Sequence, residues 1–178
     1  MDKKNQKYDL HTIVLNSKRL RKEHIKEINV IPIKGDVKEH FYELKIVVEA
    51  HEMAFKKCTV EEGLKLKEIF NGYGNIFTTT PHINEDKSVL SQLFIDNCIE
   101  KGACAVPILE SGDGASSNFI INVNGDCHEI TRKRLKGLSS YIKGVLSTNS
   151  LLQLDHDRFG RILQKYRLFL ERVSELDD

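Results

Sequence analysis

The sequence lacks any long apolar run. No segment of its 178 residues approaches the roughly 18 uninterrupted apolar residues that a membrane-spanning helix needs. The lysine-rich residues 1–10 are followed by only five residues of mixed apolar character, which does not match a secretory signal. We therefore expect a cytoplasmic protein without a membrane partner. The length suits one compact domain, or one domain with an appended helical unit.

Closely spaced metal ligands are also missing. The four cysteines, Cys58, Cys98, Cys104 and Cys127, form no C-x-x-C pair, and the seven histidines form no H-x-x-H or H-E-x-x-H pair. Zinc sites depend on such spacing, so we predict reduced core cysteines and assign no histidine a metal or catalytic role. We expect no metal and no cofactor.

A phosphate-binding loop is absent as well. Residues 112–114, Gly-Asp-Gly, are not followed by Gly-Lys-Ser or Gly-Lys-Thr, and the next segment has the pattern of a strand. A phosphate cradle needs a helix N-terminus after its glycines. We predict instead a hairpin loop between strands at residues 103–109 and 118–124, followed by a second hairpin turn at Asn124-Gly125.

The sequence does contain an uneven distribution of charge. Residues 83–129 carry two Lys or Arg against eight Asp or Glu, whereas residues 130–172 carry ten against three. Residues 1–28 are basic too, with eight against four. Basic ends therefore enclose an acidic middle. This pattern favours either an acidic partner or pairing of the ends with the middle inside the fold.

Hydrophobic residues alternate with polar ones in the first third of the chain. Residues 30–33 and 40–49 have a period of two, and a turn leads from them into residues 53–58. This alternation predicts an antiparallel sheet with one solvated face. Before it, residues 10–15 predict a short strand and residues 18–27 a surface helix.

Helical periodicity dominates later. Thr59 is a suitable N-cap for a helix over residues 60–71, and a short strand over residues 76–80 ends at Pro81. Residues 87–101 are apolar around most of a helix circumference, which is typical of a core helix.

Two amphipathic helices are predicted at the end of the chain. Thr131 caps the first, which runs to about Leu146, and the second covers residues 156–176. Apolar residues recur at steps of three and four in both helices: Leu135, Leu138, Ile142 and Val145, then Phe159, Ile162, Tyr166, Phe169, Val173 and Leu176. Because only nine residues join them, we predict an αα-hairpin.

Together these patterns predict an α+β fold. An antiparallel β-meander packs on the central helix of residues 87–101, and the αα-hairpin follows it. The candidate boundary lies near Ile130. It separates an α+β core domain, residues 1–130, from a C-terminal helical hairpin, residues 131–178, that packs on the core or extends from it.

One residue set is compatible with an enzyme. Asp36, Glu43 and Lys45 match the D, E-x-K pattern of metal-dependent nucleases, in which two carboxylates hold magnesium and a lysine helps to activate water. Glu43 and Lys45 would share the solvent face of a strand. The pattern also arises by chance in a chain with 30% charged residues. Residues 155–157, Asp-His-Asp, are better explained as a helix start than as an acid–base trio.

Basic side chains recur with helical spacing on three segments. Contacts with phosphate groups would give such side chains an affinity that depends on salt but not on base sequence. The predicted nucleic-acid-binding residues are Lys18, Arg19, Arg21, Lys22, Arg132, Arg134, Lys136, Lys143, Arg158, Arg161, Lys165 and Arg172.

The first hypothesis is therefore a binding protein rather than an enzyme, contacting DNA, RNA or a nucleoprotein complex through basic helices. The alternative is a protein–protein interaction module, such as an inhibitor, an adaptor or a homodimer, that uses the apolar seam of the last helix. The second alternative is a metal-dependent nuclease. The solvated face of an ordinary surface helix would also explain exposed charge.

Overall fold

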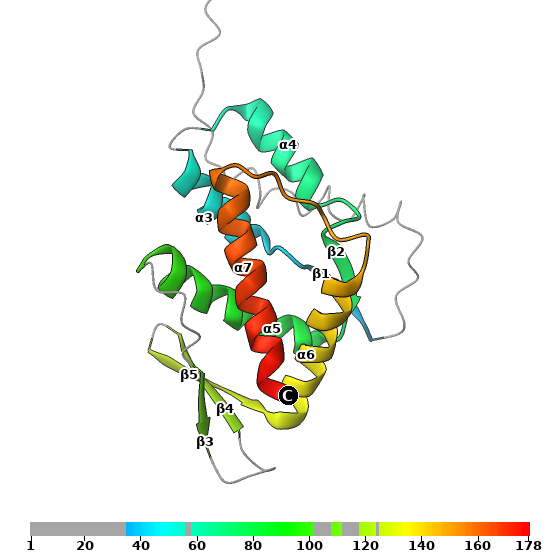
Figure 1. Ribbon diagram of the computed structural model, residues 1–178, viewed down its shortest axis with the longest axis vertical. Coiled ribbons are helices and arrows are strands. Elements are labelled where there is room, and N and C mark those ends of the chain that lie inside the picture. Colours follow the sequence, from blue (N-terminus) through cyan, green and yellow to red (C-terminus); the bar gives the residue numbers. More distant parts are fainter. Residues whose placement is uncertain (1–34, 56–57, 102–107, 112–117, 124) are drawn as a thin grey trace, which may run out of the picture.

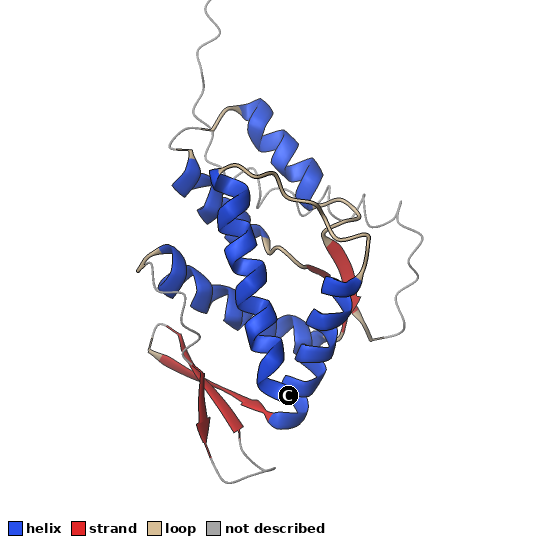
Figure 2. Ribbon diagram, in the orientation of Figure 1, coloured by secondary structure: helices blue, strands red, loops and turns tan. Residues whose placement is uncertain are grey.

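The computed structural model describes residues 35–55, 58–101, 108–111, 118–123 and 125–178. Helices and two small antiparallel sheets make up these residues, so the predicted α+β class is confirmed (Figures 1 and 2). A three-stranded antiparallel meander contacts a helix, and a helical hairpin ends the chain, as predicted, although residues 108–131 rather than residues 30–58 provide the meander. None of the helices in these ranges is both long and apolar enough to cross a membrane. The strands and the helix predicted before residue 34 lie outside the described residues.

The first sheet joins two distant strands. Strand β1 (Val37–His40) pairs antiparallel with β2 (Ile76–Thr79), with Val37 opposite Thr79 and His40 opposite Ile76. The chain between them forms two helices, α3 (Leu44–Ala54) and α4 (Val60–Phe70). The strand at 76–79 was predicted, but its partner was not.

The predicted strand over residues 40–49 is wrong, because most of it belongs to α3. The strand interpretation expected a buried and a solvated face. Instead the consecutive residues Ile46, Val47 and Val48 are all at most 1% exposed, as is Ala50. A strand would send neighbouring side chains to opposite faces, whereas a helix surrounded by other elements buries consecutive residues. The strand predicted over residues 53–58 is also wrong, since Met53 and Ala54 end α3.

Local capping sets the next helix starts. Thr59 accepts from the backbone N–H of Glu62 while Glu62 accepts from that of Thr59, a reciprocal capping box that confirms the predicted start of α4. Helix α5 (Pro81–Phe94) begins at Pro81 rather than at the predicted Lys87. Thr80 caps it, and proline fits its first position because no hydrogen bond is needed from that nitrogen. A π-helical segment, Ile95–Ile99, continues α5.

The meander consists of β3 (Ile108–Ser111), β4 (Asn118–Val123) and β5 (Asp126–Thr131), in sequence order. The pairing of β4 with β5, in which Val123 lies opposite Asp126, confirms the second predicted hairpin, and Gly125 adopts a φ of 85°. Such a positive φ suits glycine because it has no Cβ. The buried side chains of Phe119 and Ile121 in β4 join the main core, on the side where β4 contacts α5.

The last two helices confirm the αα-hairpin. Helix α6 (Arg132–Ser147) is capped by Thr131, and α7 (Arg158–Ser174) is capped by Asp157. Helix α7 contacts α3 and α5 as well as α6, so its apolar seam serves several partners within the chain (Figure 1). The seam is widened by Leu163 and Leu170, which are fully buried, whereas Leu176 is 39% exposed. The division into domains at residue 130 stays a prediction.

Residues 148–157 join α6 to α7, and we call this segment the strap. Backbone contacts hold it at two points. Near its middle, the Leu152 N–H donates to the carbonyl of Gly74 at 2.8 Å. A Cβ on Gly74 would lie 2.9 Å from the Leu152 nitrogen. At the other end, a Cβ on Gly160 would lie 1.8 Å from the carbonyl oxygen of Asp155. The strap therefore depends on two glycines that let backbone approach backbone.

Candidate functional site

Four basic side chains of α7 form one exposed stripe, which we call the α7 basic face: Arg158, Arg161, Lys165 and Arg172. At about 100° per residue, the four positions fall within an arc of about 60° around the helix. They extend along about 21 Å of its axis, at about 1.5 Å per residue. No ion pair joins any of them to another described residue.

Packing on the opposite side of α7 determines which way this stripe faces. Leu163, Tyr166 and Leu170 are fully buried against the other helices. At about 100° per residue, the four basic positions lie between about 110° and 175° from the centre of this buried face, on the side of the helix that is exposed to solvent. The apolar seam thus holds the basic stripe outward.

Acidic side chains lie beside the stripe rather than within it. Glu171 and Glu175 are exposed and occupy the neighbouring arc, together with Leu168, which is 44% exposed. The exposed side of α7 is therefore divided into a basic half and a mixed half. A polyanion would be attracted most strongly along the basic half, where no acidic side chain of α7 interrupts the stripe.

The predicted basic residues of α6 have different environments. Arg134 is held by the buried Asp86, with Nε to Oδ2 at 3.0 Å and Nη2 to Oδ1 at 2.5 Å. The Arg132 guanidinium lies over the Phe119 ring at 5.4 Å, and Lys143 donates to Asp178 at 2.8 Å. These three side chains contribute to holding α6 in the fold.

The structure thus brings together only part of the predicted set. The four α7 residues share one face, and Lys136 is exposed on α6. The predicted residues Lys18, Arg19, Arg21 and Lys22 lie outside the described residues.

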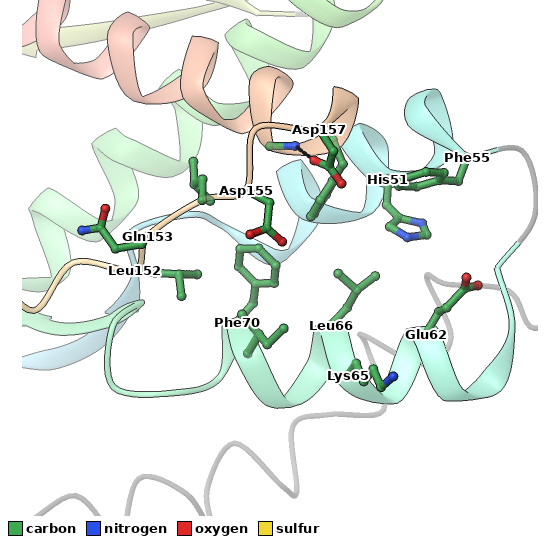
Figure 3. Close-up of a pocket in the computed structure, with 14 residues that line it drawn as sticks. His51, Phe55, Glu62, Lys65, Leu66, Phe70, Leu152, Gln153, Asp155 and Asp157 are labelled. Carbon is green, nitrogen blue, oxygen red and sulfur yellow. Dashed lines mark hydrogen bonds between the residues drawn. The ribbon is translucent and has the colours of Figure 1, made fainter.

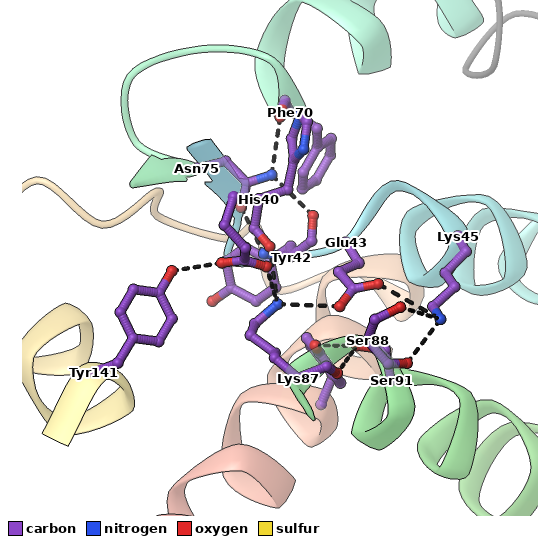
Figure 4. Close-up of polar contacts among 12 residues, drawn as sticks. His40, Tyr42, Glu43, Lys45, Phe70, Asn75, Lys87, Ser88, Ser91 and Tyr141 are labelled. Carbon is purple, nitrogen blue, oxygen red and sulfur yellow. Dashed lines mark hydrogen bonds and ion pairs between the residues drawn. The ribbon is translucent and has the colours of Figure 1, made fainter. Parts of the chain in front are cut away.

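A second polar site, which we call the Lys87 cluster, joins four elements (Figure 4). The fully buried ammonium of Lys87 on α5 donates to Glu39 of β1 at 2.5 Å and to the His40 carbonyl at 2.9 Å. Glu43, the N-cap of α3, lies 3.5 Å from the same nitrogen. Tyr141 of α6 donates to the other Glu39 oxygen at 2.5 Å.

The electrostatics of this cluster favour fixed protonation states. Although burial opposes its charge, the carboxylates of Glu39 and Glu43 raise the pKa of Lys87 above its ordinary value. Burial and the Glu39 carboxylate likewise raise the pKa of Tyr141. Both side chains keep their protons at physiological pH, so neither is suited to act as a general base or a nucleophile. The arrangement suits a structural role.

The D, E-x-K set is only partly assembled. Glu43 and Lys45 lie 3.6 Å apart, but at the start of α3 and not on a strand face, so the predicted geometry is wrong. Lys45 also donates to the carbonyl of Ser88 at 2.8 Å. Asp36 has no ion pair or hydrogen bond with either side chain among the described residues. Across the same ranges, no group of three His, Cys, Asp or Glu side chains is placed to hold a metal ion.

Sequence reasoning missed the Lys87 cluster, although a weak signal exists. Lys87 precedes Leu90 by three residues and Phe94 by seven, so helical spacing places a lysine on the buried face of α5. Such a position requires a buried countercharge. Its partner, Glu39, lies 48 residues earlier, and no local pattern connects the two.

Comparison with known proteins gives one extensive match. Uncharacterized protein DDB_G0275161 of Dictyostelium discoideum is 66% identical over 184 residues, which cover 98% of this chain and 98% of that protein. No protein-family model and no solved structure matches the chain.

Proposed function

We propose that this chain, which belongs to the same family as the Dictyostelium discoideum protein DDB_G0275161, is a non-enzymatic nucleic-acid-binding protein. It contacts DNA or RNA, alone or in a nucleoprotein complex, through the α7 basic face. A cytoplasmic location belongs to the same proposal.

One observation carries the proposal. The four cations of the α7 basic face share one exposed arc and have no ion pair within the described part of the chain. Ordinary surface charges alternate in sign, and this stripe does not. Its length of about 21 Å matches about six phosphate steps of a strand at about 3.4 Å each. The expected recognition is of the backbone and not of base sequence.

Salt dependence provides the test. Four phosphate contacts on duplex DNA predict a slope of log K against log salt of about −3.6, or about −2.8 on a single strand. For a duplex, binding should therefore weaken by about 100-fold between 50 and 200 mM salt. Fluorescence anisotropy with generic DNA and RNA oligonucleotides measures this. Binding that ignores salt, or no binding at low salt, would contradict the proposal.

Charge-removing variants locate the contact. The double variant Arg161→Ala with Lys165→Ala should flatten the slope by about two, because each lost phosphate contact removes about one. Lys65→Ala is the matched control, since Lys65 is an exposed lysine of α4 that pairs with Glu61. If the control reduces the slope as much as an α7 variant does, binding follows net charge and not the α7 basic face.

The apolar surface that α7 offers to a protein partner is smaller than the sequence predicted. Tyr166, Phe169 and Val173 of the seam are buried within the chain. A partner of α7 would have to use Leu168 and Leu176, which are 44% and 39% exposed. Light scattering tests this alternative: a homodimer that Leu168→Lys converts to a monomer supports it.

A further inference from the structure

A cavity of about 470 Å³ lies between α4 and the body of the protein (Figure 3). None of the described residues that line it belongs to the Lys87 cluster. Leu66 and Phe70 of α4 form one wall. Leu152 of the strap and Phe159 of α7 form the other. The volume falls in the range of about 300–1,000 Å³ that is typical of small-molecule sites.

The wall opposite α4 is preorganised. The strap is held at Gly74 by a hydrogen bond and at Gly160 by a close backbone contact. Asp157 caps α7 by accepting from the Gly160 N–H at 2.7 Å. A ligand would therefore meet this wall with its backbone already in place, which lowers the entropic cost of binding.

One polar side chain in the cavity has no partner. His51, at the end of α3, is only 6% exposed, and its Nδ1 has no hydrogen-bond partner among the described residues. Its ring points from α3 toward α4 in the cavity (Figure 3). The Phe55 and Phe159 rings lie 4.9 and 5.3 Å from it, between centroids. A buried nitrogen without a partner costs free energy that a bound donor would recover.

Carboxylates flank the histidine on both sides. Glu62 of α4 and Asp157 of the α7 start line the same cavity, and both act electrostatically on His51. Burial nevertheless lowers the pKa of His51, so its ring is neutral at physiological pH. One nitrogen of a neutral imidazole can accept a hydrogen bond. The hydrogen bond from the Thr59 N–H lowers the pKa of Glu62, which keeps that carboxyl charged.

We infer that this cavity binds a small organic amine with an apolar body. The ammonium group donates to the Nδ1 of His51 and lies near the Glu62 and Asp157 carboxylates. The apolar body lies against the apolar side chains that line the cavity, among them Leu66 and the Phe70 and Phe159 rings, whose centroids are 5.9 Å apart. Aromatic faces also attract cations, which adds to the preference for an amine. A carboxylic acid would meet two like charges, and a neutral molecule would leave them uncompensated by a ligand charge.

Three probes with one apolar body test the ligand class: 4-phenylbutylamine, 4-phenylbutanol and 4-phenylbutyrate. Each is titrated into the full-length protein and followed by two-dimensional ¹H–¹⁵N NMR. The amine should bind at least about tenfold more tightly than the alcohol, and the carboxylate should bind weakest. Shifts should centre on the amides around His51, Phe70 and Phe159.

Charge-removing variants that preserve the helix caps test the site. Glutamine can replace glutamate in a capping box, and asparagine is as good an N-cap as aspartate. Glu62→Gln with Asp157→Asn should weaken amine binding at least about tenfold and leave alcohol binding unchanged. Glu61→Gln, an exposed neighbour that does not line the cavity, is the matched control and should leave both unchanged.

Several outcomes would overturn the inference. These are equal binding of amine and alcohol, no binding of the amine at millimolar concentration, shifts centred elsewhere, or an equal effect of Glu61→Gln. The nucleic-acid proposal is independent of this result. Arg161→Ala with Lys165→Ala, on the exposed side of α7, should leave amine binding unchanged.

Discussion

The Lys87 cluster and the His51 cavity are two ways of placing polar groups among apolar ones. At Lys87, one fully buried ammonium meets Glu39, Glu43 and a backbone carbonyl. At His51, a buried nitrogen has no hydrogen-bond partner among the described residues and faces a volume of about 470 Å³.

The difference shows what each site can do. A satisfied buried ion pair resists change, because removing either partner leaves an isolated charge. It joins β1, α3, α5 and α6 but offers nothing to a ligand. An unsatisfied group in a preorganised cavity gains free energy from an added partner. We therefore assign the Lys87 cluster to stability and the His51 cavity to binding.

The largest expected effect is at the Lys87 cluster. Lys87→Met leaves Glu39 buried without its countercharge and should lower the free energy of unfolding by about 3–5 kcal/mol. Urea denaturation measures this loss. Lys65→Met, at an exposed ion pair with Glu61, is the control and should change stability by less than about 0.5 kcal/mol.

A double variant tests whether pairing is the cause. Adding Glu39→Gln to Lys87→Met removes the isolated charge and should restore part of the lost stability, with a coupling of about 1–3 kcal/mol. If the losses of unfolding free energy from Lys87→Met and Glu39→Gln simply add, the two side chains act separately. The Lys87 cluster would then not owe its stability to pairing, which is the property that distinguishes it from the His51 cavity.

The strap should show a smaller loss. Gly160→Ala forces a Cβ toward the Asp155 carbonyl oxygen and should cost about 1–3 kcal/mol as the strap moves. It should also weaken amine binding, because a cavity wall shifts. Gly144→Ala in α6 is the matched control: no atom lies within 4 Å of its Cβ position, and it should stabilise the protein by about 0.5–1 kcal/mol. Equal effects of the two variants would show that the strap tolerates the added methyl group.

The smallest expected effect concerns His51 and pH. Burial lowers the pKa of His51 in the folded protein, so the unfolded chain takes up this proton first on acidification. Stability should therefore fall as the pH drops from about 6.5 toward the folded-state pKa, by at most about 1.4 kcal/mol per pH unit.

Comparing variants isolates this contribution. The loss of stability between pH 7.5 and 5.5, measured by urea denaturation, should be about 1 kcal/mol smaller in His51→Leu than in the parent protein. His156→Gln removes an exposed histidine and should leave the loss unchanged. An equal pH dependence in His51→Leu and the parent protein would mean that folding does not lower the pKa of His51.

Only some parts of the sites could be predicted from sequence. The helical spacing of Arg158, Arg161 and Lys165 placed them on one side of α7, because the repeat of a helix depends only on position. That Arg134 is held by Asp86 could not be predicted, since the two lie 48 residues apart. The His51 cavity has no sequence signature, because its walls come from α3, α4, the strap and α7.

By itself the sequence determined the features that depend on neighbours along the chain. These are the caps at Thr59 and Thr131 and the turn at Gly125, each of which is completed within a few residues, and the seam of α7, whose apolar residues repeat every three or four positions. Only the tertiary structure decided that residues 44–54 form a helix, that β1 pairs with β2, and that Lys87 is paired. Burial and long-range pairing override local periodicity in those places, because their free energy comes from contacts between distant segments.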